Sequence, residues 1–170
     1  MHVATSLRIR PLTESDSIAE LTDLLHRAYA ELGERGLRFT AVDQTETTTR
    51  ARIERGRCFV AVLNGEIIGT ITFYSPSPNA VSAWYRLPGV ATFGQFGVDP
   101  AHRGKRIGMQ LLAHVEALAR AEGAVELALD TAENAIALVD MYASMGFRVV
   151  GHDDHIVPAY RSIVMSKTLS

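Results

Sequence analysis

The order of strand-like and helix-like segments constrains the fold of this chain more than any other feature of its sequence. Periodic apolar residues predict strands over 6–12, 58–63, 67–73, 91–98, 125–130, 147–151 and 161–168, and helices over 13–33, 44–55, 107–123 and 134–145. Asn64-Gly65, between two of the strands, is typical of a tight hairpin turn. The order β-α-α-β-β-β-α-β-α-β-β predicts an α/β (α+β) protein with helices packed on the faces of a mixed sheet.

Glycine and capping residues predict where several of these segments bend or end. Thr13 is expected to begin the first helix and Gly33 to end it, while Gly146 is expected to end the last helix. Gly94 and Gly97 lie inside the strand 91–98, where glycine indicates a bulge or a close approach of another backbone.

The composition is that of a globular protein. The chain has 170 residues, 47% of them hydrophobic, and 17 Lys and Arg against 19 Asp and Glu give a formal net charge of −2. These values argue against disorder and against a nucleic-acid partner, and the lack of an apolar run of about 18 residues argues against a membrane span. The first residues lack the apolar centre of a signal peptide, so we expect one cytoplasmic domain over residues 1–170.

The segment 98–108 carries the clearest chemical signal, because a strand ends, a glycine-containing turn follows and a helix begins. Arg103, Lys105 and Arg106 are concentrated there, although the positive end of a helix dipole normally favours acidic residues. A phosphate group would neutralise this positive charge and accept hydrogen bonds from the free N–H groups of the helix. The alternative is a solvated basic turn. The patterns of a Walker P-loop and of a dinucleotide-binding fold are both absent.

Two stretches of the chain resemble motifs of the GNAT superfamily of acyl-CoA-dependent N-acyltransferases. Segment 103–108 resembles the pattern Q/R-x-x-G-x-G/A, with Arg103 and Gly108 at its ends and Arg106 at the position of the middle glycine. Downstream, a second family pattern is matched in order by Asn134, Ala137, Tyr142, Gly146 and Phe147. The resemblance extends over about the whole chain.

The resemblance implies a mixed, mostly antiparallel sheet in which the strands 91–98 and 125–130 run parallel and splay apart, flanked by about four helices. It also implies that acetyl-CoA binds in that gap and at the following helix, and that no metal is needed. Since a helical φ does not require glycine, we expect Arg106 to preserve the backbone cradle. Asn134 is either a ligand of acetyl-CoA or the N-cap of its helix. The cofactor-binding residues implied are Phe96, Gly97, Val98, Arg103, Gly104, Lys105, Arg106, Ile107, Gly108 and Asn134.

The catalytic residue implied is Tyr142. A phenol is protonated at neutral pH and can donate a proton to the departing thiolate; the alternative is a half-buried aromatic residue with a packing role. Many protein-lysine members carry a glutamate as base on the strand before the first motif, and here that position falls on Thr92. A base is then expected through water or from the substrate side, with Tyr29, Glu31, Glu34 and His155 as candidates.

Three other features allow weaker interpretations. His152-Asp-Asp-His155 is interpreted as a polar hairpin loop and not as a metal site, although Asp153 and Asp154 could attract a cationic amine if this hairpin borders the acceptor. Cys58 is expected to be a small core residue. Trp84 and Tyr85 are expected either to cover the acceptor or to line a dimer contact.

The resemblance therefore predicts an enzyme that transfers acetyl from acetyl-CoA to a primary amine. The missing glutamate favours a small-molecule or amino-acid-like acceptor over a protein lysine or N-terminus. The alternative from another class is an acyl-CoA-binding sensor that does not turn over. A homodimer is left open, and neither a nucleic acid nor a membrane is expected as partner.

Overall fold

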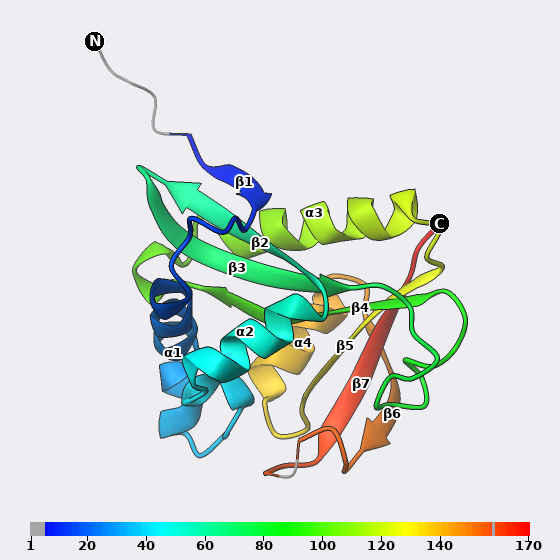
Figure 1. The fold of residues 1–170 in the computed structure, drawn as a ribbon. Coiled ribbons are helices and arrows are strands. Elements are labelled where there is room, and N and C mark those ends of the chain that lie inside the picture. The colour runs from blue at the N-terminus through cyan, green and yellow to red at the C-terminus, as the bar shows by residue number, and fades with distance from the viewer. Residues whose placement is uncertain (1–5, 158) are drawn as a thin grey trace.

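The computed structural model describes residues 6–157 and 159–170. The first residues of the chain, on which the expectation about a signal peptide rests, lie partly outside these ranges. The predicted order of strands and helices is confirmed (Figure 1). The strands are β1 (Arg8–Pro11), β2 (Arg57–Leu63), β3 (Glu66–Tyr74), β4 (Val90–Val98), β5 (Glu126–Ala132), β6 (Arg148–Asp153) and β7 (Ser162–Thr168). The helices are α1 (Ile18–Glu34), α2 (Glu46–Glu54), α3 (Ile107–Ala121) and α4 (Ile136–Ser144), with two short 3-10 helices, Thr40–Val42 and Pro100–His102.

All seven strands form one sheet in the order β1-β2-β3-β4-β5-β7-β6. Every neighbouring pair is antiparallel except β4 and β5, which run parallel and pair only where Val90–Thr92 meet Glu126–Ala128. Beyond these residues the two strands diverge, while β4 stays paired with β3 and β5 with β7 (Figure 1). The predicted splayed parallel pair is therefore confirmed.

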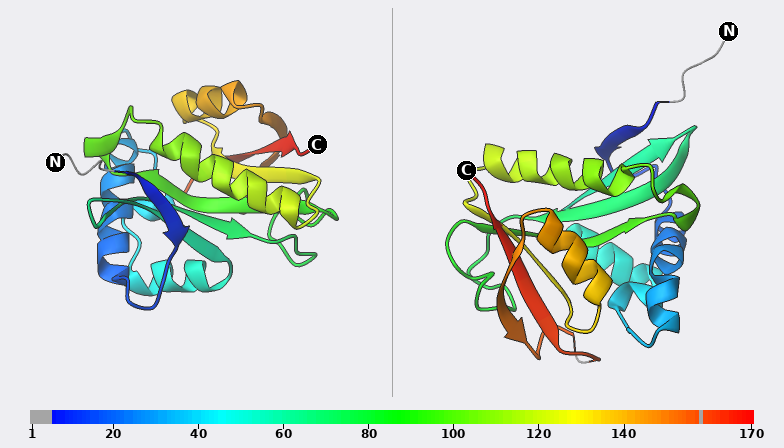
Figure 2. Two further views of the ribbon diagram at one scale, coloured as in Figure 1. Left: turned by 90° about the horizontal axis from the view of Figure 1, so that it is seen from above. Right: turned by 180° about the vertical axis from the view of Figure 1, so that it is seen from behind.

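Alternate residues of β2 face two different hydrophobic clusters. Phe59 and Ala61 pack into the cluster that contains residues of α3 and α4, whereas Cys58 and Val60 pack with residues of α1. Helices α3 and α4 therefore cover one face of the sheet and α1 the other, with α2 beside α1 (Figure 2). Cys58 is the buried core residue that was expected, and burial raises the pKa of its thiol.

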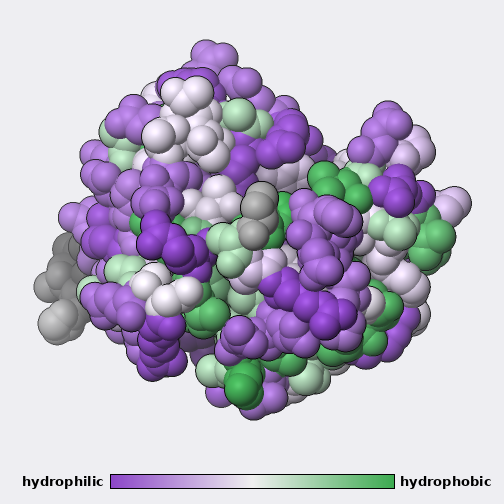
Figure 3. Space-filling model, turned by 90° about the horizontal axis from the view of Figure 1, so that it is seen from below, coloured by the Kyte–Doolittle hydropathy of each residue, from purple (hydrophilic) through white to green (hydrophobic). Residues whose placement is uncertain are grey.

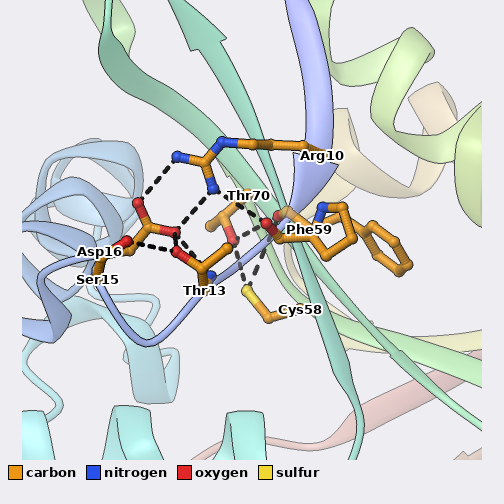
Figure 4. A network of polar contacts seen from close by, with 8 residues as sticks. Arg10, Thr13, Ser15, Asp16, Cys58, Phe59 and Thr70 are labelled. Atoms are coloured by element: carbon orange, nitrogen blue, oxygen red, sulfur yellow. Dashed lines mark hydrogen bonds and ion pairs between the residues drawn. The ribbon is translucent and has the colours of Figure 1, made fainter.

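The predicted start of α1 at Thr13 is wrong. The helix begins at Ile18, after Ser17, whose hydroxyl accepts a hydrogen bond of 3.1 Å from the backbone N–H of Glu20. Asp16 lies before the helix: its Oδ2 accepts the backbone N–H of Thr13 at 2.7 Å, and its two oxygens accept hydrogen bonds of 2.8 and 2.9 Å from the Arg10 guanidinium (Figure 4). This network closes a turn between β1 and α1 and leaves the cap to Ser17.

Left-handed backbone conformations occur at the hairpin turn between β2 and β3, after the end of α1 and at a bulge in β4. Asn64 and Gly65 have φ of 52° and 78°, which confirms the predicted hairpin turn. Helix α1 continues through Gly33, and the glycine with positive φ after its end is Gly36, at 81°. The predicted bulge in β4 is also present, but its left-handed residue is Gln95, with φ of 47°.

Gly97 of β4 serves close packing instead. A Cβ placed on Gly97 would lie 2.9 Å from Cβ of Ala28, so the absence of a side chain lets α1 approach the strand. This contact brings α1 against the part of β4 that has diverged from β5.

The surface is mixed. On the face that Figure 3 shows, hydrophobic residues form small separate patches between hydrophilic ones. In the part of the chain that the structure describes, none of the helices combines the length and the hydropathy needed to span a membrane.

Candidate active site

A groove of about 1370 Å³ lies between α1, the diverging end of β4, the start of α3, and α4. It lies beside the part of β4 that has diverged from β5. Of the predicted cofactor-binding residues Lys105 alone does not line it; those that do are Phe96, Gly97, Val98, Arg103, Gly104, Arg106, Ile107, Gly108 and Asn134. The sheet topology thus brings together residues of β4, α3 and α4 around one groove.

Arg106 is not in the helical conformation that was expected. It is the N-cap of α3, with φ of 60° and ψ of 22°, in the left-handed region that favours glycine. The expectation failed because this residue stands just before the helix, where the chain must turn out of the preceding loop. The backbone N–H groups of the first turn, from Ile107 onward, still have no helical acceptors and border the groove.

The three cations at this helix start differ in their surroundings. Arg103 donates from Nη2 to the backbone carbonyl of Ala28 at 2.7 Å, and its Nη1 lies 3.6 Å from a carboxylate oxygen of Glu31. Lys105 and Arg106 have no carboxylate within 4.0 Å among residues 6–157 and 159–170. Protein groups therefore neutralise part of the charge of Arg103, whereas Lys105 and Arg106 have no carboxylate partner in the described ranges.

Asn134 does not cap α4. The N-cap is Ala135, which has no side-chain hydrogen bond, and Asn134 lies in the turn before it, on the wall of the groove. The N-cap interpretation is therefore wrong, and an Asn134 contact with a ligand in the groove stays a prediction.

A second, smaller cavity of about 90 Å³ lies on the other side of β4 from α3, between α1, α2, β4, β5 and the loop after β6. Four residues line both hollows: Tyr29, Phe96, Leu138 and Tyr142. The two hollows are therefore neighbours, and these four side chains border both of them.

Tyr142 is a buried aromatic residue at this junction, with 7% of its surface exposed. Its ring lies 6.2 Å from that of Phe93 and 5.8 Å from that of Phe147, so the packing role considered for it is real. Burial raises the pKa of its phenol well above the ordinary value, and the hydroxyl stays protonated at neutral pH. Position and protonation state both suit a proton donor, which stays a prediction.

The bases proposed from the sequence are poorly placed. The Tyr29 hydroxyl donates a hydrogen bond of 2.7 Å to the carbonyl oxygen of Phe96, and burial raises its pKa to about 12. Glu31 lines the groove, but its Oε1 lies 2.6 Å from Nη2 of Arg35 and is therefore occupied by an ion pair. Neither Glu34 nor His155 lines either hollow, and the same is true of Thr92.

The smaller cavity holds two charged residues that the sequence analysis missed. Arg52 of α2 and Asp130 of β5 are the charged side chains among its described lining residues, and both are half-buried. Oδ1 of Asp130 accepts a hydrogen bond of 2.7 Å from the Tyr85 hydroxyl. Burial raises the pKa of the Asp130 carboxyl, while the Tyr85 bond and the charge of Arg52 act in the opposite direction. Tyr85 itself lines neither hollow, so its expected role at the acceptor or at a dimer contact stays a prediction.

The loop after β6 contributes to this cavity through Val157 and Tyr160 and not through its acidic residues. Oδ1 of Asp153 accepts the backbone N–H of His155 at 2.7 Å, and Asp154 lies 3.5 Å from Arg161. Over the described ranges no three His, Cys, Asp or Glu residues are grouped so that they could hold a metal ion.

Comparisons with known proteins agree with this geometry. A family model described as the Acetyltransferase (GNAT) family matches residues 18–147. The S-(2-succino)cysteine N-acetyltransferase of Bacillus subtilis (strain 168) is 30% identical over 167 residues, covering 95% of this chain and 96% of that protein. The solved ribosomal-protein-S18-alanine N-acetyltransferase of Escherichia coli matches with a TM-score of 0.73 at 20% identity, over 97% and 95% of the two chains. A GNAT family acetyltransferase of Elizabethkingia anophelis with acetyl-CoA bound matches with a TM-score of 0.71 at 19% identity, over 96% and 98%.

Proposed function

Because this chain belongs to the acetyltransferase (GNAT) family and is an enzyme of that type, we propose that it transfers acetyl from acetyl-CoA to the primary amine of a small, amino-acid-like acceptor. The observation that carries the proposal is the position of Tyr142 on the walls of two neighbouring hollows. The larger groove has the size and the helix start suited to acetyl-CoA, and the smaller cavity suits a compact acceptor.

The first part of the proposal concerns acetyl-CoA. The free N–H groups at the start of α3 and the cation Arg106, which lines the groove, suit the pyrophosphate, and the unpaired edge of β4 beyond Thr92 suits the amide groups of the pantetheine arm. A family relative with this fold has been solved with acetyl-CoA bound. The reacting thioester would then lie at the inner end of the groove, beside Tyr142.

The second part concerns the acceptor. The relative from Bacillus subtilis is named for S-(2-succino)cysteine, an amino acid with a free amine. Asp130 places a negative charge in the smaller cavity, where it would attract the ammonium form of such an acceptor. A pKa raised by burial also makes this carboxylate a better proton acceptor than an exposed aspartate, so Asp130 takes the place of the bases expected from the sequence.

These groups define a direct transfer. The amine loses its proton to Asp130 or to water beside it, and its nitrogen attacks the thioester carbonyl. As the new C–N bond forms, the C–S bond breaks and Tyr142 protonates the departing sulfur. As the amide forms, the second proton of the nitrogen passes through solvent to the Tyr142 phenolate, and Asp130 releases its proton to solvent, so no covalent enzyme intermediate is needed and Cys58 stays in the core.

A thiol-release assay tests the function. Acetyl-CoA would be supplied with S-(2-succino)cysteine, with simple alkylamines, with a lysine peptide and with a peptide that begins with alanine. We expect turnover with the amino acid and little with either peptide. Turnover restricted to the peptides would overturn the proposed acceptor, and CoA binding without turnover of any amine would favour a sensor instead.

A further inference from the structure

We propose that Arg52 and Gln95 form a subsite for a carboxylate group of the acceptor. The proposal rests on the proposed function for the statement that the occupant is the acceptor amine. It goes beyond that function because it requires the acceptor to carry a carboxylate as well as an amine. Two observations support the proposal. In the hydrogen-bond network around Gln44, the identity of each donor and acceptor follows from the Arg52 guanidinium, which can only donate. Within the described part of the chain, this network leaves N–H donors of Arg52 and Gln95 without acceptors.

The side chain of Gln44 fixes the orientation of the network. A guanidinium group only donates, so the bond of 2.9 Å from Nη1 of Arg52 identifies the atom of Gln44 that receives it as the amide oxygen. The other terminal atom is therefore Nε2, which donates bonds of 2.7 Å to Oγ1 of Thr49 and to the Gln95 side chain. His26 also holds Gln44, by a bond of 2.7 Å to its backbone oxygen.

Among the described residues, the side-chain nitrogen of Gln95, with its two N–H donors, is left without an acceptor. Because Gln44 donates to it, the atom it presents must be Oε1, and its own Nε2 is then directed elsewhere. Gln95 lines the smaller cavity and is 3% exposed, and its Nε2 has no partner among the described residues. Oγ1 of Thr131, another lining residue that is 2% exposed, is in the same situation. Buried donors of this kind cost free energy unless an acceptor is supplied.

Arg52 supplies the charge that makes an anionic acceptor atom the natural partner. Its backbone is tied to β3, because its carbonyl oxygen accepts a bond of 3.0 Å from the Tyr74 hydroxyl. Only one bond occupies the guanidinium, and across the described residues no carboxylate oxygen lies within 4.0 Å of it, although Asp130 lines the same cavity. The planar fork of N–H groups that remains matches the two oxygens of a carboxylate.

The two charged residues of the cavity therefore favour an acceptor with opposite charges of its own. Arg52 and Gln95 would hold its carboxylate, while Asp130 would hold its ammonium group. In a compound such as S-(2-succino)cysteine the carboxylate has two sources, the α-carboxylate and those of the succinyl group. Either carboxylate could accept the same hydrogen bonds from Arg52 and Gln95, and the ligands used in the test distinguish the two.

The test measures binding to the CoA-saturated protein by calorimetry, with four ligands. S-(2-succino)cysteine carries both kinds of carboxylate, S-ethylcysteine only the α-carboxylate, S-(2-succino)cysteamine only those of the succinyl group, and S-ethylcysteamine none. We expect S-ethylcysteamine to bind roughly 30-fold or more weakly than the better of the two single-source ligands, as for the loss of a buried charged hydrogen bond. Equal binding of all four ligands would overturn the subsite, and so would a failure of all four to bind.

Three variants show whether Arg52 and Gln95 cause the difference. Arg52→Met should remove the preference for carboxylates, and Arg52→Lys should restore part of it, since the charge returns without the planar fork. Gln95→Glu keeps an oxygen toward Gln44 and replaces the unused donor by an anion, so it should weaken carboxylate ligands and spare S-ethylcysteamine. Arg50→Met, at an exposed position of the same helix, is the matched control and should change nothing.

The outcomes separate the subsite from the proposed function. If carboxylate ligands bind and Arg52→Met abolishes their advantage, but no acetyl transfer occurs, the proposed function fails and the subsite stands. If Arg52→Met weakens all four ligands equally while CoA affinity and melting temperature are unchanged, the residue shapes the cavity without recognising a carboxylate, and the proposal is wrong.

Discussion

The Tyr85 hydroxyl donates a hydrogen bond of 2.7 Å to Oδ1 of Asp130 and so connects the loop before β4 with the middle of the sheet. This bond stabilises the ionised carboxylate, against a burial that raises its pKa. An aspartate that must be ionised to receive an ammonium group loses this ability as the pH falls through its pKa. The acid limb of the activity profile should therefore report on Asp130.

Tyr85→Phe should move that limb to higher pH. Without the donor, the charged form of Asp130 loses stabilisation and its pKa rises further. The measurement is kcat/KM for acetyl transfer between about pH 5 and pH 9. Asp130→Asn is the control, because it should lower activity and remove the limb; an unchanged limb in that variant would assign it to another group.

Tyr142→Phe tests the proton donor. We expect kcat to fall about 100-fold with KM nearly unchanged, because the phenol acts on the departing sulfur and not on acceptor binding. Since burial raises the pKa of Tyr142, its ionisation should cause no loss of wild-type activity up to about pH 10. Melting temperature and CoA affinity serve as controls for folding, and an unchanged kcat would remove Tyr142 from the mechanism.

Arg106→Gly should stabilise the protein, whereas Lys105→Gly should destabilise it. Arg106 has a left-handed φ of 60°, which costs about 1–2 kcal/mol for a residue with a Cβ and nothing comparable for glycine. Lys105 has no such φ, so glycine there only adds freedom to the unfolded chain, at about 0.5–1 kcal/mol. Urea unfolding would compare the two variants, and effects of the same sign would contradict the interpretation.

Asp16→Asn should lower the free energy of unfolding by about 1.5–3 kcal/mol at pH 7, because it removes charge-assisted bonds from Arg10. These bonds hold the pKa of Asp16 well below its ordinary value, so their contribution is present above the unfolded pKa of about 3.9 and is lost as the pH falls below it. Unfolding in urea at pH 7 and at about pH 2 should show the difference between variant and wild type shrink. Asp23→Asn, at an exposed position on α1, should show no such pH dependence.

Local signals predicted most of the secondary structure. Asn64-Gly65 specified its turn because both residues tolerate positive φ, and the apolar periodicity of α3 and β2 survived because those faces are buried in the core. The start of α1 was misjudged because Asp16 had another partner, the Arg10 guanidinium, which no pattern around Thr13 reveals. Boundary residues are decided by such competing bonds.

The smaller cavity, which we propose for the acceptor, was missed for a different reason. Arg52, Gln95 and Asp130 come from α2, β4 and β5, and nothing in the sequence around each of them indicates a common site. Arg52 resembles any charged residue on a polar helix, and Gln95 any residue of a strand. The one usable signal was Asp130, a carboxylate at the end of an apolar strand. Family motifs found the groove because its residues are nearly contiguous in the chain.

The sheet is held together at its centre by the three residue pairs between β4 and β5. It can therefore be regarded as two sub-sheets, β1 to β4 and β5 to β7, joined at a narrow seam with a wedge-shaped opening below it. A ligand that bonds to both sides of that opening would act as a missing strand. The mechanical continuity of the sheet would then depend on occupancy, and amide hydrogen exchange along the diverging part of β4 should slow when the wedge is filled.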